Sequence, residues 1–461
     1  MQQKRETLLP IKEVKHKARR KAIKETIFSS IKTSLGEKYL APFAIAVNTS
    51  NPLVAIMSSI SGLLGPLSQT VGSKIMKKTS RKNILARTAF FEALIWLPLV
   101  IITILYLKGV LTQFIPFAVL LIFSLYIILN NLGHPAYFSW IGEIVDKKYR
   151  GRWLSKKTLI ASVITVIISI LAAIILDKLK DMNLEMQGFA LLFLLAFFAR
   201  IKCYKIYKQE YFPKRKFKKE SEFTFWQFLK QAPKTNFGKF TIFRAALGFA
   251  TSISSPLLAI YLLRELQLNY SWYMIIILAG TIFSIFVLAL WGKINDFYGS
   301  YKVILITSIA IPLIPILWII SHSLFYLIII PSLIGGIAWA GFDLAAKNFI
   351  YDNVSKQKRG IAVSYYNLLI GIGVFIGAGI SALLIEFIKT TWIKPIILIF
   401  IMGTILRAIV VIFGIKHLAE IRKTKIKGFK ELEHLLLKEA KPSLHEEMHE
   451  IIAIKDYIQE K

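Results

Sequence analysis

The sequence contains a single cysteine, Cys203, in 461 residues. An intrachain disulfide is therefore excluded, and so is a metal cluster built on cysteine. Acidic residues are also scarce, with 27 against 59 lysines and arginines, which leaves a formal net charge of +32. The basic N-terminus lacks the short apolar core and the small-residue cleavage site of a secretory signal peptide. We therefore expect neither a disulfide-stabilised domain nor a cleaved leader.

Long apolar runs are abundant. Hydrophobic residues make up 55% of the chain, and the mean hydropathy is +0.56. Apolar runs of roughly 18 to 25 residues recur, and each is long enough to cross a hydrocarbon core of about 30 Å as a helix. Lysines and arginines lie in the gaps, so the basic excess indicates membrane topology rather than nucleic-acid binding. We expect an all-α integral membrane protein.

The apolar runs predict twelve transmembrane helices. Lys32, Glu37 and Lys38 interrupt the first run, but twelve spans place both termini in the cytoplasm and gather the basic loops there, as the positive-inside rule requires. Without the first span, the basic N-terminus would lie on the wrong side. The spans lie near residues 28–49, 51–76, 84–107, 114–144, 157–177, 188–208, 239–264, 271–294, 303–321, 324–350, 361–388 and 394–417.

The two halves of the chain share an internal repeat. GSKIMKKTSRKNIL (72–85) and GKINDFYGSYKVIL (292–305) agree at five of fourteen positions. The repeat predicts two six-helix bundles related by pseudo-two-fold symmetry, with a central site between them. Three further pairs recur in the same order at similar offsets: Pro42 and Pro256, Arg150 and Arg359, and Arg200 and Arg407.

We expect five segments along the chain. The linker between the bundles contains KRKFKKESEFTFWQFLK, in which basic residues precede an aromatic turn, so we expect it on the inner membrane face. The segments are a basic cytoplasmic N-terminal segment (1–26), an N-terminal six-helix bundle (27–208), a cytoplasmic linker with an amphipathic helix (209–238), a C-terminal six-helix bundle (239–417) and a cytoplasmic helical tail (418–461).

Three stretches resemble the major facilitator superfamily. The loop Gly292-x-x-x-Asp296-x-x-Gly299-x-x-Lys302 is similar to the family signature between helices 8 and 9. The resemblance covers about residues 27–417 and implies a secondary active transporter that moves a small solute across the cell membrane by alternating access. Two other stretches resemble helices 4 and 7 of a largely uncharacterised prokaryotic subset: NLGHPAYFSWIGEIVDKKYRGR (131–152) and SPLLAIYLLRELQLNYSWY (255–273).

The same resemblance implies a gating role for the loop residues. Asp296 would face the positive N-terminus of helix 5 and favour one closed state of the cytoplasmic gate. The alternative is a solvated loop carboxylate. The first-half copy has Met76 and Thr79 where the acid and the second glycine should be, so any such lock is asymmetric. The candidate gating residues are Gly292, Asp296, Gly299, Lys302, Arg150 and Arg359.

Polar and ionisable side chains within the apolar runs are the candidate substrate or coupling residues. Each charge costs at least about 2.5 kcal/mol at the centre of a span unless it is paired or hydrated. His134 and Asp343 both lie sixteen residues before an Arg-Gly pair, so the repeat predicts that they face each other. Alternatively, Asp343 and Lys347 neutralise each other at i, i+4, and His134 is structural. The candidates are Glu37, Asn130, Asn131, His134, Arg244, Asp343 and Lys347.

Two further features of the runs suggest structural roles. Arg200 and Arg407 lie deep in their spans, and their long stems are expected to reach the cytoplasmic interface. The eleventh run contains a set of glycines, which suggests close helix packing. These glycines are Gly371, Gly373, Gly377 and Gly379.

The stretch HEEMH (445–449) fits the H-E-x-x-H pattern of zinc peptidases. Ser443 precedes it as a predicted N-cap, with Glu446 closing a capping box, so each residue has a structural role without zinc. No third ligand or substrate cleft accompanies the motif. We therefore expect a tail helix, no metal, no cofactor and no enzymatic activity.

The expected partners are the lipid bilayer and a small-molecule substrate, with or without a coupling ion. We expect a monomer and no nucleic-acid partner. A second class of function stays open, namely an intramembrane lipid-handling protein such as a flippase, or a membrane enzyme that uses carboxylates within the membrane.

Overall fold

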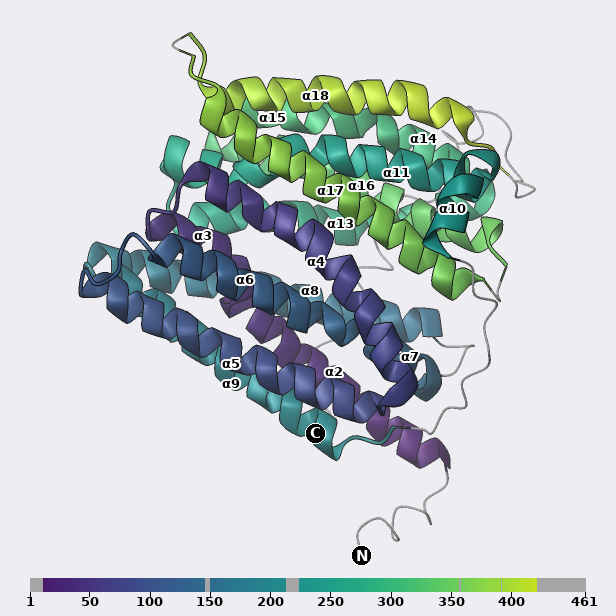
Figure 1. Cartoon of the computed structure of the whole chain (residues 1–461), viewed down its shortest axis with the longest axis horizontal. Coiled ribbons are helices and arrows are strands. Elements are labelled where there is room, and N and C mark those ends of the chain that lie inside the picture. The colour runs from purple at the N-terminus through teal and green to yellow at the C-terminus, as the bar shows by residue number, and fades with distance from the viewer. Residues whose placement is uncertain (1–10, 146–149, 213–223, 356–357, 391, 421–461) are drawn as a thin grey trace, which may run out of the picture. The chain divides into compact units, whose positions relative to one another are not determined.

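The computed structural model describes residues 11–145, 150–212, 224–355, 358–390 and 392–420. Within these ranges the chain is almost entirely helical and has no β-strand (Figure 1). The HEEMH stretch and the KRKFKK part of the linker lie outside them. The chain forms two compact units, the first from residues up to Thr49 and from Leu64 to Lys218, the second from Ser50–Leu63 and residues from Lys219 onward.

Each of the six spans predicted in the first half corresponds to one helix or to a broken pair of helices. The first span breaks at Gly36, where a Cβ atom would lie 2.4 Å from the Trp96 ring. The fourth breaks at Gly133, with Pro135 in the next turn. The helices are α2 (Ile11–Leu35) with η2 (Glu37–Tyr39) and α3 (Leu40–Ala46), α4 (Asn51–Lys78), α5 (Arg81–Leu107), α6 (Ile115–Leu132) with α7 (His134–Ile144), α8 (Arg150–Asp181) and α9 (Glu185–Gln209).

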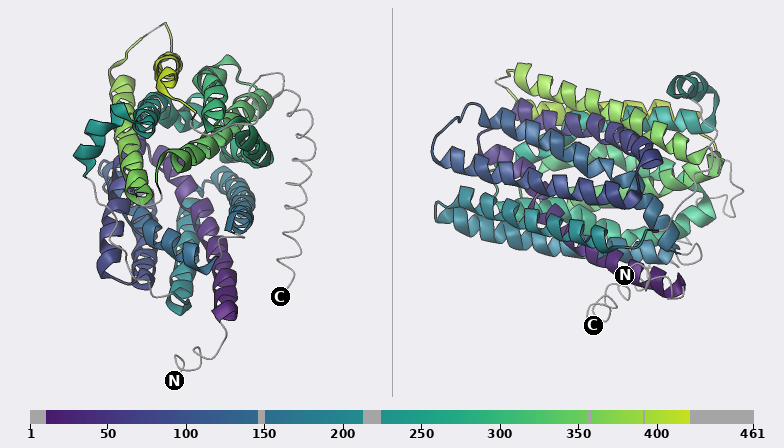
Figure 2. Two further views of the ribbon diagram at one scale, coloured as in Figure 1. Left: turned by 90° about the vertical axis from the view of Figure 1, so that its right-hand side faces the viewer. Right: turned by 60° about the horizontal axis from the view of Figure 1, so that its bottom comes forward.

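The second half repeats this pattern, and its breaks fall at prolines. Pro256 interrupts the seventh span and Pro312 the ninth, because proline cannot donate the helical hydrogen bond. Figure 2 shows long helices packed side by side within each unit. The helices are α10 (Phe225–Gln231), α11 (Asn236–Ser254) continued through η5 (Ser255–Leu257) and α12 (Leu258–Ile260) to the π-helix η6 (Tyr261–Glu265), α13 (Tyr270–Tyr298), α14 (Ser300–Ala310) with η7 (Ile311–Leu313) and α15 (Ile314–Ile320), α16 (Leu324–Asn353), α17 (Arg359–Phe387) and α18 (Pro395–Gly414).

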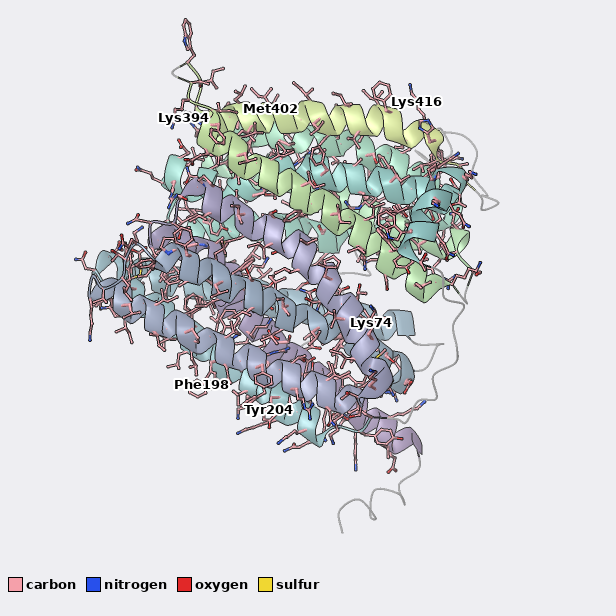
Figure 3. All side chains as sticks on the ribbon, viewed as in Figure 1. Lys74, Phe198, Tyr204, Lys394, Met402 and Lys416 are labelled. Atoms are coloured by element: carbon pink, nitrogen blue, oxygen red, sulfur yellow. The ribbon has the colours of Figure 1, made fainter. Side chains whose placement is uncertain are left out.

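Ten spans in the described part of the chain are long and apolar enough to cross a membrane. The first and sixth predicted spans, α2 to α3 and α9, are not among them, and these helices carry the charged residues Lys32 and Arg200. Large apolar side chains lie exposed along the spans, and Figure 3 shows Phe198 and Met402 projecting from α9 and α18. Such exposure suits a surface that contacts lipid.

The first helix begins well before the predicted residue 28. It starts at Ile11, and Ala18 and Ala22 are fully buried in a cluster that includes Trp140 and Cys203. The segment is rich in lysine and arginine, so its composition hides these small buried residues. The sequence pattern therefore placed the start of the helix too late.

The glycines of the eleventh span allow α11 and α17 to pack closely, as their spacing predicted. A Cβ atom on Gly373 would lie 2.3 Å from the Ala245 carbonyl oxygen, and one on Gly377 would lie 2.2 Å from the Phe249 carbonyl oxygen. These distances are too short for any side chain. Gly373 and Gly377 thus bring the two backbones into direct contact.

One helix, α4, is divided between the two units. Its first turns belong to the second unit, where the Ser59 hydroxyl donates a hydrogen bond of 2.7 Å to the Phe375 carbonyl of α17. A Cβ atom on Gly62 would lie 2.6 Å from the Val374 side chain. From Leu64 onward the helix belongs to the first unit, and Pro66 lies inside it just after this point.

Candidate functional site

In the first unit, Glu92 connects two cations within the helix bundle. The side chain on α5 is fully buried. One carboxylate oxygen lies 3.1 Å from Lys32 Nζ of α2, and the other lies 2.5 Å from a guanidinium nitrogen of Arg200 on α9. Lys32 and Arg200 are buried too. Since an unpaired charge in such surroundings is costly, each of the three charges is stabilised by its neighbours.

A second carboxylate, Glu25 of α2, reaches the same arginine. It lies 3.9 Å from the Arg200 guanidinium and accepts a hydrogen bond of 2.7 Å from the Tyr207 hydroxyl of α9. Glu25 is 3% exposed, so it belongs to the interior of the unit.

A third carboxylate, Glu37, lies at the break between α2 and α3. It is 3.7 Å from Lys32 and accepts a hydrogen bond of 2.5 Å from the Tyr126 hydroxyl of α6. Its side chain is 41% exposed. The charge cluster therefore has three carboxylates and two cations, with one excess negative charge when all are ionised. Its members are Glu25, Lys32, Glu37, Glu92 and Arg200.

The predicted residues of helix 4 lie near the break at Gly133. His134 begins α7 and is partly buried. Asn131 accepts a hydrogen bond of 2.9 Å from the Gln69 amide, which connects α6 to α4. Asn130 is partly buried on α6. The structure thus places Glu37 in the charge cluster and gives Asn131 a contact between helices.

In the second unit, Arg244 of α11 pairs with Asp343 of α16. Their charged atoms lie 3.7 Å apart, and the Asp343 side chain is 54% exposed. The guanidinium lies over the rings of Trp339 and Phe342, with its carbon 5.3 and 5.2 Å from the ring centres. Stacking on aromatic rings fixes the cation without using its hydrogen-bond donors. The donors therefore remain able to bind an oxygen-rich ligand.

Lys347 does not neutralise Asp343 as the i, i+4 alternative predicted. In the described part of the chain, Asp343 makes its ion pair with Arg244, and Lys347 is exposed on α16 without an ion pair. The predicted approach of His134 to Asp343 joins the two units and stays a prediction.

The loop between α13 and α14 holds the predicted gating residues. Gly299 has φ of 95°, a conformation that side chains rarely adopt, so a glycine is required there. Lys302 lies over the Tyr298 ring at 4.4 Å. Asp296 is exposed in the last turn of α13, and around Gly292 there is open space for a side chain. Gly299 thus has a backbone role and Gly292 has no packing role among the described residues.

The two Arg-Gly arginines are placed differently. Arg359 donates hydrogen bonds of 3.0 Å to the carbonyls of Tyr351 and Val354, at the C-terminal end of α16. A cation there complements the negative end of the helix. Arg150 begins α8, and its side chain lies outside the described part of the structure.

The expectation that the side chains of Arg200 and Arg407 reach the cytoplasmic interface is wrong. Neither stem reaches the interface, because both side chains are buried, with exposed fractions of 7% and 4%. Arg200 belongs to the charge cluster, in which it pairs with Glu92 of α5, a helix far from α9 in the sequence. Both arginines occupy equivalent positions in the internal repeat. That equivalence marked them as a structural pair, and the expectation that they reach the interface did not take it into account.

Comparison with known proteins identifies the fold. A family model described as Major Facilitator Superfamily matches residues 240–448, and solved structures of transporters match most of the chain. The chain has the fold of the Major Facilitator Superfamily (MFS). The resemblance stated from the sequence is thus confirmed for the fold, and the apolar spans make this chain a multi-pass membrane protein.

Three solved structures illustrate the similarity of this fold to others. A mutant of the nucleoside transporter NupG has a TM-score of 0.65 at 15% identity, covering 87% of this chain and 100% of that one. A bacterial metal transporter has 0.60 at 15%, covering 88% and 99%. A bacterial homologue of the iron transporter ferroportin, in an inward-facing state, has 0.64 at 14%, covering 87% and 98%. No curated protein matches. Identities this low show a shared fold alone.

Proposed function

We propose that this protein is a member of the MFS and a secondary active transporter that moves a small solute across the cell membrane by alternating access, with both termini in the cytoplasm. The Arg244–Asp343 pair supports this proposal most directly. A carboxylate that is 54% exposed on a membrane-spanning helix is costly unless it faces water or a ligand. A binding site for a polar solute accounts for its presence.

The charge cluster of the first unit supplies a candidate coupling site. Its one excess negative charge can be balanced by a proton or another cation, and Glu37 is its most exposed carboxylate. In this proposal His134, Asn130 and Asn131 line the site in the first unit, and Arg244, Asp343 and Lys347 line it in the second. Substrate and ion would then act on groups from both halves of the chain.

The alternative is an intramembrane lipid-handling protein, such as a flippase, or a membrane enzyme. One observation favours a lipid-like ligand, namely a mostly apolar cavity of about 360 Å³ in the second unit that Arg407 lines. The Arg244–Asp343 pair lies outside the set of residues that line this cavity, although Trp339 belongs to both. The two functions can therefore be tested with different ligands.

Transport assays in proteoliposomes test the proposal. The purified full chain would be supplied with labelled nucleosides, divalent metal ions and small carboxylates, with and without a pH gradient. Two of the similar solved structures are named as a nucleoside transporter and a metal transporter, and we chose the panel of solutes accordingly. We expect concentrative uptake of one class that depends on the gradient. Transfer of a labelled lipid between leaflets without uptake of any solute would favour the flippase instead.

Asp296→Asn is expected to shift the balance between inward- and outward-facing states without abolishing substrate binding. Asp296 lies in the last turn of α13, where a negative charge is unfavourable against the negative end of its own helix. By the family resemblance, its partner in one state would be the positive N-terminal end of helix 5. The measurement is the reaction rate of a cysteine probe placed on the cytoplasmic side.

The control for this variant is Asp352→Asn, another acid at the cytoplasmic end of a helix, which accepts a hydrogen bond of 3.3 Å from the Ser300 hydroxyl. It should leave the probe's reaction rate unchanged. An unchanged rate in Asp296→Asn as well would remove the gating role.

A further inference from the structure

Arg407 is a buried cation without an anion. Its guanidinium, 4% exposed on α18, donates to the Ser254 hydroxyl at 2.8 Å and to the carbonyls of Thr251 and Ile311 at 3.1 and 3.4 Å. Its Nε atom is buried and has no hydrogen-bond partner. Among the described residues, Arg407 forms no salt bridge with a carboxylate. All its partners are neutral, so its charge is not balanced by the protein around it.

Arg200, the equivalent arginine of the first half, has carboxylates beside it. Arg200 has Glu92 at 2.5 Å and Glu25 at 3.9 Å. The repeat offset of 220 that relates residues 72–85 to 292–305 takes Glu92 to Pro312, since 92 plus 220 is 312. The offset of 214 between Pro42 and Pro256 takes Glu25 to Lys239. Neither position in the second half is acidic, so the counter-anions present around Arg200 are missing around Arg407.

The local structure is built to hold the arginine in place. Pro315 cannot donate to the Ile311 carbonyl, so that oxygen accepts from the Ile314 amide and from Arg407 instead. Gly403, one turn before Arg407, allows α18 to approach α11, because a Cβ atom there would lie 2.8 Å from the Ser254 hydroxyl oxygen. The guanidinium is thus positioned by the backbones of two other spans.

Arg407 lines a cavity of about 360 Å³, within the range of roughly 300 to 1,000 Å³ that is usual for small-molecule sites. The cavity lies among α11, α13, α15, α16 and α18. Its walls are mostly apolar and aromatic, with Trp318 and Trp339 among them, and its few polar side chains include Thr251 and Ser254 beside the arginine. An apolar chamber with a single buried cation matches a ligand with one anionic group and an apolar body.

We propose that this cavity binds an amphiphile with one anionic head group, such as a medium-chain carboxylate or an anionic lipid. The head group replaces the missing counter-anion of Arg407, and the apolar body lies against Trp318 and Trp339. This site adjoins the proposed transport site at Trp339, but Arg244 and Asp343 do not line it, and binding to it requires no ion gradient.

The test is equilibrium binding of radiolabelled dodecanoate to the full chain in a non-ionic maltoside detergent, with dodecanol as the neutral ligand of the same chain length. We expect saturable binding of dodecanoate and at least about tenfold weaker binding of dodecanol, the effect of one charge-assisted contact. Arg407→Gln should bring dodecanoate to the level of dodecanol, and Arg407→Lys should retain part of the difference.

A second variant keeps the charge and fills the space. Gly335 lines the cavity, and a Cβ atom there would meet only the Ile314 side chain at 3.8 Å, so Gly335→Leu is accommodated by the empty volume. It should weaken both ligands about equally, and it supports the test if Arg407→Gln does not fold. Lys416→Gln, on the exposed end of the last span, is the control and should bind as the wild type does.

A competition experiment distinguishes the two sources of the anion. Displacement of dodecanoate by phosphatidylglycerol in nanodiscs would identify an anionic lipid, and retention of dodecanoate would identify a free carboxylate; both support the site. Absence of saturable binding, equal affinity for dodecanoate and dodecanol, or unchanged dodecanoate binding in the Arg407→Gln and Gly335→Leu variants would overturn the proposal.

Discussion

Glu92→Gln is expected to destabilise the protein by about 3–5 kcal/mol, because it leaves Lys32 and Arg200 buried without the carboxylate between them. The side chain keeps its size, so the loss is electrostatic rather than a cavity. The measurement is the thermal stability of the detergent-solubilised protein, followed by the amount that stays monodisperse after heating.

The control for this prediction is Glu265→Gln, which removes a carboxylate 2.6 Å from Lys394. That lysine is 62% exposed, so the pair contributes only about 0–1 kcal/mol. Adding Arg200→Gln to Glu92→Gln should restore part of the stability, since it removes one of the unpaired cations. Equal melting of Glu92→Gln and Glu265→Gln would show that the charge cluster does not hold the first unit together.

Asp343→Asn is expected to lower the transport rate about 30-fold or more while the protein stays folded. The carboxylate is 54% exposed, so its pairing with Arg244 contributes little to stability. Its loss matters for a ligand or ion that desolvates the carboxylate on binding, because removing one partner of a charge pair that is desolvated in the complex typically costs about 2–5 kcal/mol of binding free energy. The measurement is the initial rate of uptake in proteoliposomes for the solute found by the panel.

Asp352→Asn is the matched control here too, since Asp352 lies on the same helix nine residues further on. Its uptake should equal that of the wild type. Arg244→Gln should resemble Asp343→Asn, because each removes one half of the pair. Normal uptake in both Asp343→Asn and Arg244→Gln would separate the pair from transport and leave it a purely structural contact.

The helices and their order follow from the sequence because each span is a local property. Apolar length places a span, and a proline such as Pro256 or Pro312 places its interruption. Gly373 and Gly377 also indicated a close contact between helices, because two backbones can approach this closely only where no side chain lies between them. The start of α2 was misplaced, since Ala18 and Ala22 are buried among lysines and arginines whose charges dominate the local composition.

Contacts between distant spans did not follow from the sequence. Arg244 lies 99 residues before Asp343, and nothing in the spacing favours it over Lys347 one turn away. The aromatic rings of Trp339 and Phe342 decide the outcome, because they hold the guanidinium beside the carboxylate. In the same way, Arg200 finds Glu92 on another helix, so its depth in the span reflects a partner rather than a route to the interface.

The division of α4 constrains how the chain can move. Residues 51–63 are held by the second unit through contacts such as Ser59 with Phe375, whereas the helix from Leu64 onward packs with the first. If the two units move as the alternating-access proposal requires, either these contacts slide or α4 bends. Pro66 has no amide hydrogen to donate to the Gly62 carbonyl, so the helix lacks one backbone hydrogen bond at this turn. Under that proposal, this turn would act as a hinge.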